Sequence, residues 1–132
     1  MSYRTALATR EELAVVGQLI DDYVRQNLDM AQWWPVARET FQTDYDNDCF
    51  QLMVVYNSTD QLAGFAAWVP HYDLHHCARG SLVIDLYVKP ASRGRGLAAA
   101  LISAIATIAV DQGHTFLRGI EGSKDERTST DF

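Results

Sequence analysis

The sequence has few cysteines and no long apolar run. Its two cysteines, Cys49 and Cys77, are too few for a disulfide framework, which favours a reducing, cytoplasmic compartment over a secreted one. The longest apolar stretch, residues 97–110, is too short to cross a bilayer and contains Ser103 and Thr107. Residues 1–12 lack the apolar core of a signal peptide. These absences exclude a disulfide-stapled extracellular domain and predict a protein that does not insert into a membrane.

Cations are also scarce. The sequence has 11 Lys and Arg against 17 Asp and Glu, a formal net charge of −6. A nucleic-acid-binding protein needs a basic face to neutralise phosphates, so nucleic acid is excluded as the main partner. The negative charge favours the approach of a cationic small molecule, such as an amine. Apolar residues make up 48% of the 132 residues and charged residues 21%, a composition typical of one folded domain over residues 1–132.

Hydrophobic periodicity predicts the order of the secondary-structure elements. The strands are expected at residues 3–8, 50–56, 62–69, 82–88 and 115–120, and the helices at residues 9–27, 36–43 and 97–112. A capping box, formed by Thr9 and Glu12, begins the first helix. The order β-α-α-β-β-β-α-β predicts an α+β fold of three layers. Its sheet is mixed and mostly antiparallel, with helices on both faces.

The expected loops carry most of the remaining polar residues. Residues 30–35 form a break between two helices, and Asp44, Asp46 and Asp48 form an acidic loop. Residues 71–80 read as a further loop, which holds His71, His75, His76 and Cys77. These are ligand types that zinc prefers, but their spacing matches no ligand pattern, so we predict no metal site. The loop is instead expected near the substrate entrance, with His76 as an alternative base.

The stretch LYVKPASRGRGLAAAL, residues 86–101, combines a strand, a glycine-arginine turn and an apolar helix. A helix N-terminus exposes backbone N–H groups without intrahelical partners, and its dipole favours an anion there. Glycines allow a ligand to approach the backbone, and arginines add charge and forked donors. The turn Arg93-Gly94-Arg95-Gly96 at the start of this helix therefore predicts a pyrophosphate cradle.

Two other interpretations of this turn are weaker. The glycines could simply turn the chain at the surface, but then strand, turn and buried helix would coincide by accident. Gly94-x-Gly96-x-x-Ala99 also fits a loose dinucleotide-binding pattern. In that fold, however, the glycines follow the first strand directly, whereas here residues 89–93 intervene and the unit lies late in the chain.

Residues 82–105 resemble the GCN5-related N-acetyltransferase (GNAT) family. The family's signature Q/R-x-x-G-x-G/A appears as Arg93-x-x-Gly96-x-Ala98, preceded at the usual spacing by Val88-x-Pro90. The element order over residues 3–120 is also similar to that family. The resemblance implies the GNAT acyl-CoA N-acyltransferase fold, acetyl-CoA as the cofactor, and transfer of an acetyl group to an amine.

The resemblance also implies how the cofactor would be held. The backbone amides of residues 93–98 would wrap the pyrophosphate, and the strand carrying Leu86, Tyr87 and Val88 would pair with the pantetheine arm. A bulge near residues 86–88 would separate this strand from the last one. The backbone N–H of Val88 would then polarise the thioester carbonyl.

Asp85 is the candidate general base. An amine with a pKa of about 10 is protonated at neutral pH, so a carboxylate must remove its proton. Strand alternation places Asp85 with Val83 and Tyr87 on one face, in an otherwise apolar strand. Relatives that acetylate polyamines carry an acid where this chain has Ile84, which leaves open that Asp85 is a structural acid bonded to a neighbouring loop.

Four aromatic residues are candidates for the acceptor pocket together with Asp85: Trp33, Trp34, Trp68 and Tyr72. Plain packing is an equally good interpretation of the tryptophans. The expected acceptor is a primary amine of a small molecule, polyamine or amino-acid-like, or of a protein. The alternative is a non-catalytic acetyl-CoA-binding module that regulates a partner.

Members of the resembled family usually carry a proton-donating tyrosine on a fourth helix. Residues 128–132 look like the start of that helix, and the tyrosine would follow Phe132. The last helix and two strands of the family fold are then expected beyond the chain or from a partner subunit, and we expect a homodimer. Without them, the strand at residues 115–120 would leave an open sheet edge.

Overall fold

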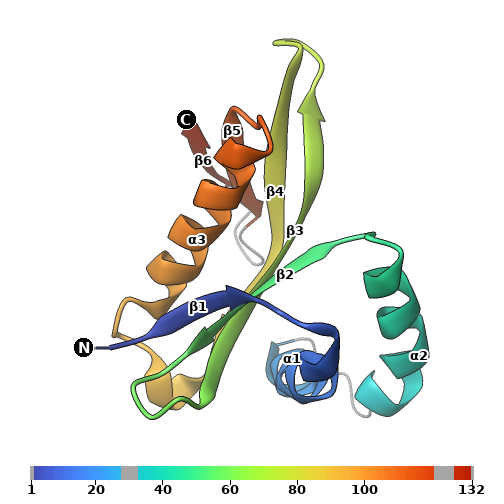
Figure 1. The fold of residues 1–132 in the computed structure, drawn as a ribbon, viewed down its shortest axis with the longest axis vertical. Helices are drawn as coiled ribbons and strands as arrows, with labels where there is room; N and C mark the ends of the chain where they lie inside the picture. Colours follow the sequence, from blue (N-terminus) through green and yellow to red (C-terminus); the bar gives the residue numbers. More distant parts are fainter. Residues whose placement is uncertain (1, 28–32, 121–126, 132) are drawn as a thin grey trace.

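The computed structural model describes residues 2–27, 33–120 and 127–131 (Figure 1). The elements in chain order are β1 (Arg4–Leu7), η1 (Arg10–Glu12), α1 (Leu13–Asn27), α2 (Trp33–Asp46), β2 (Gln51–Tyr56), β3 (Leu62–Asp73), β4 (Ala78–Val88), η2 (Pro90–Ser92), α3 (Leu97–Asp111), β5 (Phe116–Ile120) and β6 (Arg127–Asp131). The strands form one sheet in the order β1-β2-β3-β4-β5-β6. Only β4 and β5 are parallel neighbours, so the predicted mixed, mostly antiparallel sheet is confirmed.

The helices cover both faces of the sheet, as predicted: α1 and α2 lie on one side and α3 on the other (Figure 1). Successive residues of a strand point to opposite faces, and β2 follows this rule. Leu52 and Val54 pack in the core beneath α1, whereas Met53 and Val55 pack against α3. No helix in the described part of the chain is long and apolar enough to cross a membrane.

The start of α1 confirms the predicted capping box. The backbone N–H of Thr9 donates to Glu12 Oε1 at 2.8 Å, which satisfies a donor that the helix itself cannot bond. The helix then buries one apolar stripe against the sheet, consisting of Leu13, Val16, Leu19, Ile20 and Val24. This stripe places the polar tip of Tyr23 at the edge of the core.

The second helix is longer than the periodicity predicts. It begins at Trp33 and includes Pro35 in its first turn, where proline's missing N–H costs nothing. It also extends through Asp44 and Asp46, so the predicted acidic loop is wrong for these two residues. Asp46 instead pairs with Arg10 at 3.0 Å. The predicted break at residues 30–35 lies partly outside the described residues.

Helices α1 and α2 are joined by a close contact at Trp34. A Cβ built on Gly17 would lie 2.3 Å from the Trp34 ring, so only glycine fits there. The backbone N–H of Trp34 donates to the buried carboxylate of Asp21 at 3.0 Å, and Arg25 pairs with the same carboxylate at 2.9 Å. These contacts anchor the first turn of α2 on α1.

Gly17→Ala should therefore destabilise the protein, although alanine is the better helix former by about 1 kcal/mol. Because the Trp34 ring must move, we expect the free energy of unfolding to fall by about 1–3 kcal/mol in urea titrations. The exposed neighbour substitution Gln18→Ala is the control and should change it by less than about 0.5 kcal/mol. Equal stability of Gly17→Ala and the parent protein would contradict the close packing of Trp34.

Residues 71–80 do not form the predicted loop. They continue β3 and β4 as an antiparallel hairpin, with His71 opposite Gly80 and only residues 74–77 in the turn. Gly80 permits this, because a Cβ there would lie 2.2 Å from the Phe116 ring of β5. The segment has a polar pattern because the hairpin projects beyond the helices (Figure 1).

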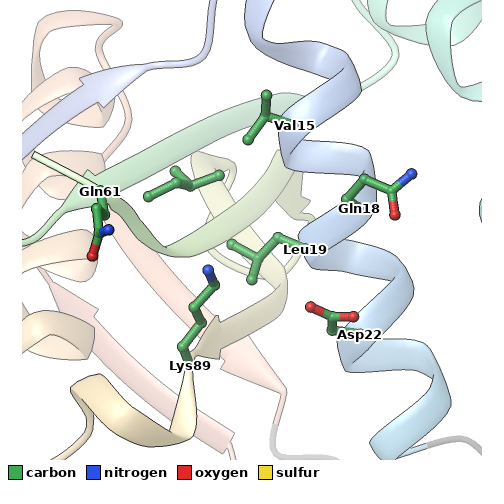
Figure 2. Close-up of a pocket in the computed structure, with 7 residues that line it drawn as sticks. Val15, Gln18, Leu19, Asp22, Gln61 and Lys89 are labelled. Carbon is green, nitrogen blue, oxygen red and sulfur yellow. The ribbon is translucent and has the colours of Figure 1, made fainter.

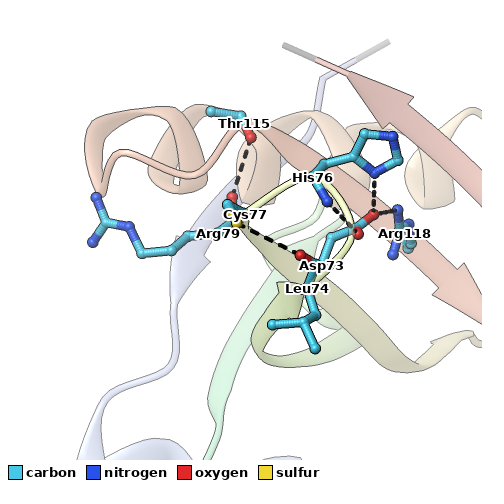
Figure 3. A network of polar contacts seen from close by, with 7 residues as sticks. All are labelled: Asp73, Leu74, His76, Cys77, Arg79, Thr115 and Arg118. Atoms are coloured by element: carbon cyan, nitrogen blue, oxygen red, sulfur yellow. Dashed lines mark hydrogen bonds and ion pairs between the residues drawn. The ribbon is translucent and has the colours of Figure 1, made fainter.

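A polar network fastens the tip of this hairpin to β5 (Figure 3). Asp73 accepts from the backbone N–H of His76 at 3.2 Å and pairs with Arg118 of β5 at 2.7 Å. The Arg118 guanidinium, followed by the bonds from His76, holds the pKa of the Asp73 carboxyl well below its usual range. His76 is therefore part of a structural turn at the far end of the hairpin from Asp85.

The C-terminal segment also differs from the prediction. Residues 127–131 form the strand β6, which pairs antiparallel with β5, and not the start of a helix. β6 therefore occupies the edge of β5 that was expected to be open. Residues 121–126 and Phe132 lie outside the described residues.

Candidate active site

A β-bulge in β4 shapes the centre of the molecule. Ala67 of β3 pairs with Asp85 and Trp68 pairs with Val83, so Ile84 has no partner in the ladder. The bulge was predicted near residues 86–88 and lies instead at residue 84. The parallel pairing of β4 with β5 ends just before it, at Val83 opposite Gly119. Within the described residues the two strands do not pair beyond the bulge. Residues 121–126, which follow β5, lie outside the described range, so the opening between the strands stays a prediction.

The bulge also reverses the alternation of side chains along β4. Val83 packs in the core on the α3 side, whereas Tyr87 packs in the core on the α1 side. Asp85 is on the α1 side too, so the prediction that it shares a face with Val83 is wrong. An extra residue in a strand moves all following side chains to the other face.

Asp85 has one described hydrogen-bond partner, Tyr23 of α1. The Tyr23 hydroxyl donates to Asp85 Oδ1 at 2.8 Å. Burial raises the pKa of Asp85, and the bond from Tyr23 opposes this by stabilising the carboxylate. Burial and the neighbouring carboxylate together raise the pKa of Tyr23 to about 12. Asp85 is therefore an ionisable carboxylate, and its raised pKa makes it a stronger proton acceptor, as a general base must be.

Asp85 faces a cavity of about 310 Å³ between α1, α2 and the sheet. Its aromatic lining consists of Tyr23, Trp33, Phe41, Phe50 and Phe65. Its aliphatic lining consists of Ile20, Val24, Leu52, Ala67 and Ile84. The bulge lets two consecutive side chains, Ile84 and Asp85, line the same cavity.

The structure brings only one of the four predicted aromatic residues to Asp85. Trp33 lines the cavity, and Trp34 is buried behind it with the two rings stacked at 5.8 Å. Trp68 is fully buried in the core on the α3 side, with its indole N–H unbonded to any described residue. Tyr72 is half-exposed on the projecting hairpin. Trp68 and Tyr72 thus lie apart from the cavity.

Sequence reasoning missed Tyr23 as a site residue. Tyr23 lies at helical spacing with the apolar residues Leu19 and Ile20, so the sequence pattern makes it one more apolar position of the first helix, and no local pattern relates it to Asp85. The only available signal was a hydroxyl on an otherwise apolar helix face, which must find a polar partner when it is buried.

The glycine-arginine turn has the predicted conformation. Gly94 and Gly96 have φ values of +76° and +78°, and a Cβ on either would meet no atom within 4 Å. Between described residues, the backbone N–H groups of residues 94–99 donate to no protein acceptor, whereas Arg93 donates to Pro90. A run of free amides beside open space, at the N-terminus of a long helix, fits a pyrophosphate.

The residues around the turn have distinct positions. Leu97 is buried and holds the helix start in the core on the α3 side, whereas Arg95 and Ala98 are exposed beside the free amides. The Arg93 side chain turns back, and its Nε donates to the Val88 carbonyl at 2.8 Å. Arg93 thus ties the turn to the end of β4.

The end of β4 is also arranged to accept an extended ligand. Leu86, Tyr87 and Val88 pair with β3 on one side, and no described strand pairs with their other side. Tyr87 is buried, and its hydroxyl donates to Gln26 of α1 at 3.0 Å. This edge, which is unpaired among the described residues, and the run of amides in the turn have the form that the pantetheine arm and pyrophosphate of coenzyme A require.

A second cavity, of about 390 Å³, lies between α1 and the segment after β4. Figure 2 shows Leu19 and Asp22 of α1 and Lys89 facing this space. Asp22 is already paired with Arg25 at 2.7 Å, and the Lys89 ammonium disfavours a cationic amine. The cavity shares no lining residue with the one beside Asp85, which is the better acceptor site.

The histidine-rich segment lies at the tip of the hairpin, not at the cavity. His71 packs edge-on against Phe116, and His76 bonds Asp73. Within the described ranges, no three His, Cys, Asp or Glu side chains converge as metal ligands do.

Comparison with known proteins identifies the fold and the family. A profile of the Acetyltransferase (GNAT) family matches residues 17–132, whereas no curated protein matches the chain significantly. A solved "probable acetyltransferase" is 20% identical over 93% of this chain and 82% of its own, with a TM-score of 0.80. The ribosomal-protein-alanine N-acetyltransferase from Brucella melitensis biovar Abortus 2308 is 19% identical over 93% of this chain and 82% of its own, with a TM-score of 0.76.

A third solved structure extends the range of acceptors among similar folds. An aminoglycoside acetyltransferase from an uncultured soil metagenomic sample, in complex with trehalose, is 15% identical over 93% of this chain and 80% of its own, with a TM-score of 0.76. The family profile covers most of the chain, and the fold is similar to that of solved acetyltransferases. This protein therefore belongs to the GNAT family of acetyltransferases and is, by class, an acetyl-CoA-dependent N-acetyltransferase.

Proposed function

We propose that the protein acetylates the primary amine of a small molecule, with Asp85 as the general base. The observation that supports this is a partly buried carboxylate, bonded to Tyr23, facing a cavity whose other lining side chains are almost all apolar. An ionisable group in such a place is costly unless it has a task.

Two segments of the chain would bind different parts of the cofactor. The free amides of residues 94–99 would hold the pyrophosphate, with Arg95 exposed beside them. The unpaired edge of residues 86–88 would bind the pantetheine arm as an added strand. Acetyl-CoA, when bound, supplies an acetyl group activated as a thioester.

Asp85 would act on the acceptor. A primary amine has a pKa of about 10, so at neutral pH it enters as an ammonium ion, which the carboxylate attracts. Asp85 accepts a proton from it and thereby frees the nitrogen lone pair. The raised pKa of Asp85 makes this transfer less uphill, and the Tyr23 hydroxyl holds the carboxylate in position.

The form of the cavity supports a small acceptor over a protein. It lies between α1, α2 and the sheet, and aromatic rings wall it. Structures of similar fold include an aminoglycoside acetyltransferase and a ribosomal-protein-alanine N-acetyltransferase, so the fold itself permits either class. A cavity of about 310 Å³ has the size of a small-ligand site.

Release of free thiol from acetyl-CoA tests the proposal. With a panel of small primary amines at neutral pH, we expect amine-dependent thiol release and a matching acetylated product by mass spectrometry. Calorimetry with coenzyme A alone should show binding. Coenzyme A binding without thiol release for any amine would favour a non-catalytic binding module instead.

We further propose a cytoplasmic location and a homodimer. Cys49 and Cys77 are both free and exposed, which suits a reducing compartment. Light scattering coupled to size-exclusion chromatography measures the oligomeric state directly, and a monomer at all concentrations would contradict the homodimer.

A further inference from the structure

The cavity beside Asp85 restricts the chemistry of the amine that it can accept. Among the described residues that line it, Asp85 carries the only charge and Tyr23 the only hydroxyl. The remaining wall is made of rings and aliphatic side chains. The part of a ligand that this lining contacts should therefore be apolar except at the amine that meets Asp85.

The aromatic wall is built as a packed unit. Phe41 lies at the centre, with its ring 6.1 Å from Trp33 at 73° and 5.2 Å from Phe50 at 34°. On the sheet side, Tyr23 meets Phe65 edge-on at 5.9 Å. Rings fixed in this way keep their shape without a ligand and offer faces and edges to another ring.

Two acceptor classes do not match this lining. An amino acid would bring a carboxylate, and no described Lys, Arg or His lines the cavity to pair with it. A polyamine would bring a second ammonium, and Ile84 stands where a second acid would reach it beside Asp85. Apart from Asp85, which meets the reacting amine, the described lining residues offer neither extra charge a partner of opposite sign, so neither would add to binding there.

The volume limits the size of the apolar part. A closed apolar cavity of about 150 Å³ is enough to bind benzene. The cavity here is about 310 Å³, which leaves room for one ring and a short arm that carries the amine to Asp85.

We propose that the acceptor is an arylalkylamine: one aromatic ring, a short apolar arm and a single primary amine, with no carboxylate and no second ammonium. This inference rests on the proposed function, because it takes Asp85 to mark the position of the reacting nitrogen. Cavity lining, packed rings and volume support it independently of the reaction.

Binding and turnover of three amines test the inference. Calorimetry on the protein loaded with coenzyme A would measure 2-phenylethylamine, spermidine and phenylalanine, and thiol release would give kcat/KM for each. We expect 2-phenylethylamine to bind, with a kcat/KM at least 100-fold above those of the other two. Phe41→Ala should weaken its binding at least tenfold, whereas Tyr72→Ala, which removes an aromatic ring outside the cavity, should not.

The variant Ile84→Glu tests whether the lack of a second acid beside Asp85 disfavours polyamines. Ile84 is 39% exposed, so a carboxylate there remains solvated and the fold tolerates it. The variant should raise the ratio of kcat/KM for spermidine over 2-phenylethylamine at least tenfold. Ile84→Gln introduces a side chain with the shape of glutamate but without its charge, and it should leave that ratio nearly unchanged.

The outcomes separate the inference from the proposed function. Equal or better binding and turnover of spermidine or phenylalanine would overturn the inference and leave acetyl transfer intact. Absence of any heat with 2-phenylethylamine would also overturn it. Binding of 2-phenylethylamine without transfer to any amine would support the cavity assignment and overturn the enzymatic role of Asp85.

Discussion

Asp85→Asn lowers kcat/KM for acetyl transfer at pH 7 by about 100-fold or more, because loss of a general base typically costs about 10²–10⁴ in rate. The deficit should shrink as the pH approaches the amine's own pKa of about 10, where the free amine no longer needs a base. Coenzyme A affinity, measured by calorimetry, should not change. Asp111→Asn, an exposed acid at the end of α3, is the matched control.

The same variant should not destabilise the protein, and this distinguishes a base from a structural acid. Burial raises the pKa of Asp85, so the folded state holds that proton more tightly than the unfolded state. The resulting loss of stability develops as the pH rises from the ordinary pKa through the raised one. Asp85→Asn removes this penalty, so its Tm at pH 7 should equal or exceed that of the parent. A lower Tm with unchanged turnover would identify Asp85 as structural.

Tyr23→Phe gives an independent check through the pH profile. The bond from Tyr23 lowers the pKa of Asp85, so its removal should raise that pKa further. Because the base must be ionised, the acidic limb of kcat/KM should move to higher pH. An unmoved limb, with Asp85→Asn still inactive, would mean that Tyr23 does not act on Asp85.

Gly96→Asp should reduce the affinity for coenzyme A by at least 100-fold. Gly96 has a φ of +78° at the N-cap of α3, and a side chain there projects into the space beside the free amides. A carboxylate about 4 Å from a phosphate repels it by about 4 kcal/mol at an effective dielectric constant of about 20. That energy corresponds to roughly a thousandfold in affinity.

Control variants separate repulsion of the ligand from damage to the fold. Aspartate tolerates positive φ better than most residues, and an acid at a helix N-terminus is favourable, so Gly96→Asp should fold. Gly96→Asn, of the same shape without the charge, should lose only about tenfold in affinity. Gly113→Asp alters a glycine with a φ of +81° at the other end of the helix and should bind normally. If all three variants bind coenzyme A equally, the turn is not the pyrophosphate site.

Much of the candidate cofactor site was predictable from consecutive residues. A strand, a turn with Gly94 and Gly96, and an apolar helix starting at Leu97 leave amides unsatisfied wherever the chain folds in this way. The conformation depends on nearest neighbours and on glycine's access to positive φ, so no tertiary information was needed.

The acceptor site was predictable only in part. Asp85 is a candidate because a carboxylate in an apolar strand is unusual, and Trp33 because the sequence places it in the break between two helices. Trp68 and Tyr72 have the same composition signal, yet the fold places one in the opposite core and the other on the hairpin. Residue type alone does not distinguish a cavity wall from a core.

The sequence by itself determined the element order over residues 3–120, the three layers and the glycine-arginine turn, because these follow from side-chain periodicity and local backbone preferences. The tertiary structure alone decided the bulge at Ile84, the face on which Asp85 lies, and its bond to Tyr23, 62 residues away. A one-residue irregularity in strand pairing leaves no local trace in the sequence, since it is selected by packing between distant segments. The same irregularity places the carboxylate beside the aromatic cavity.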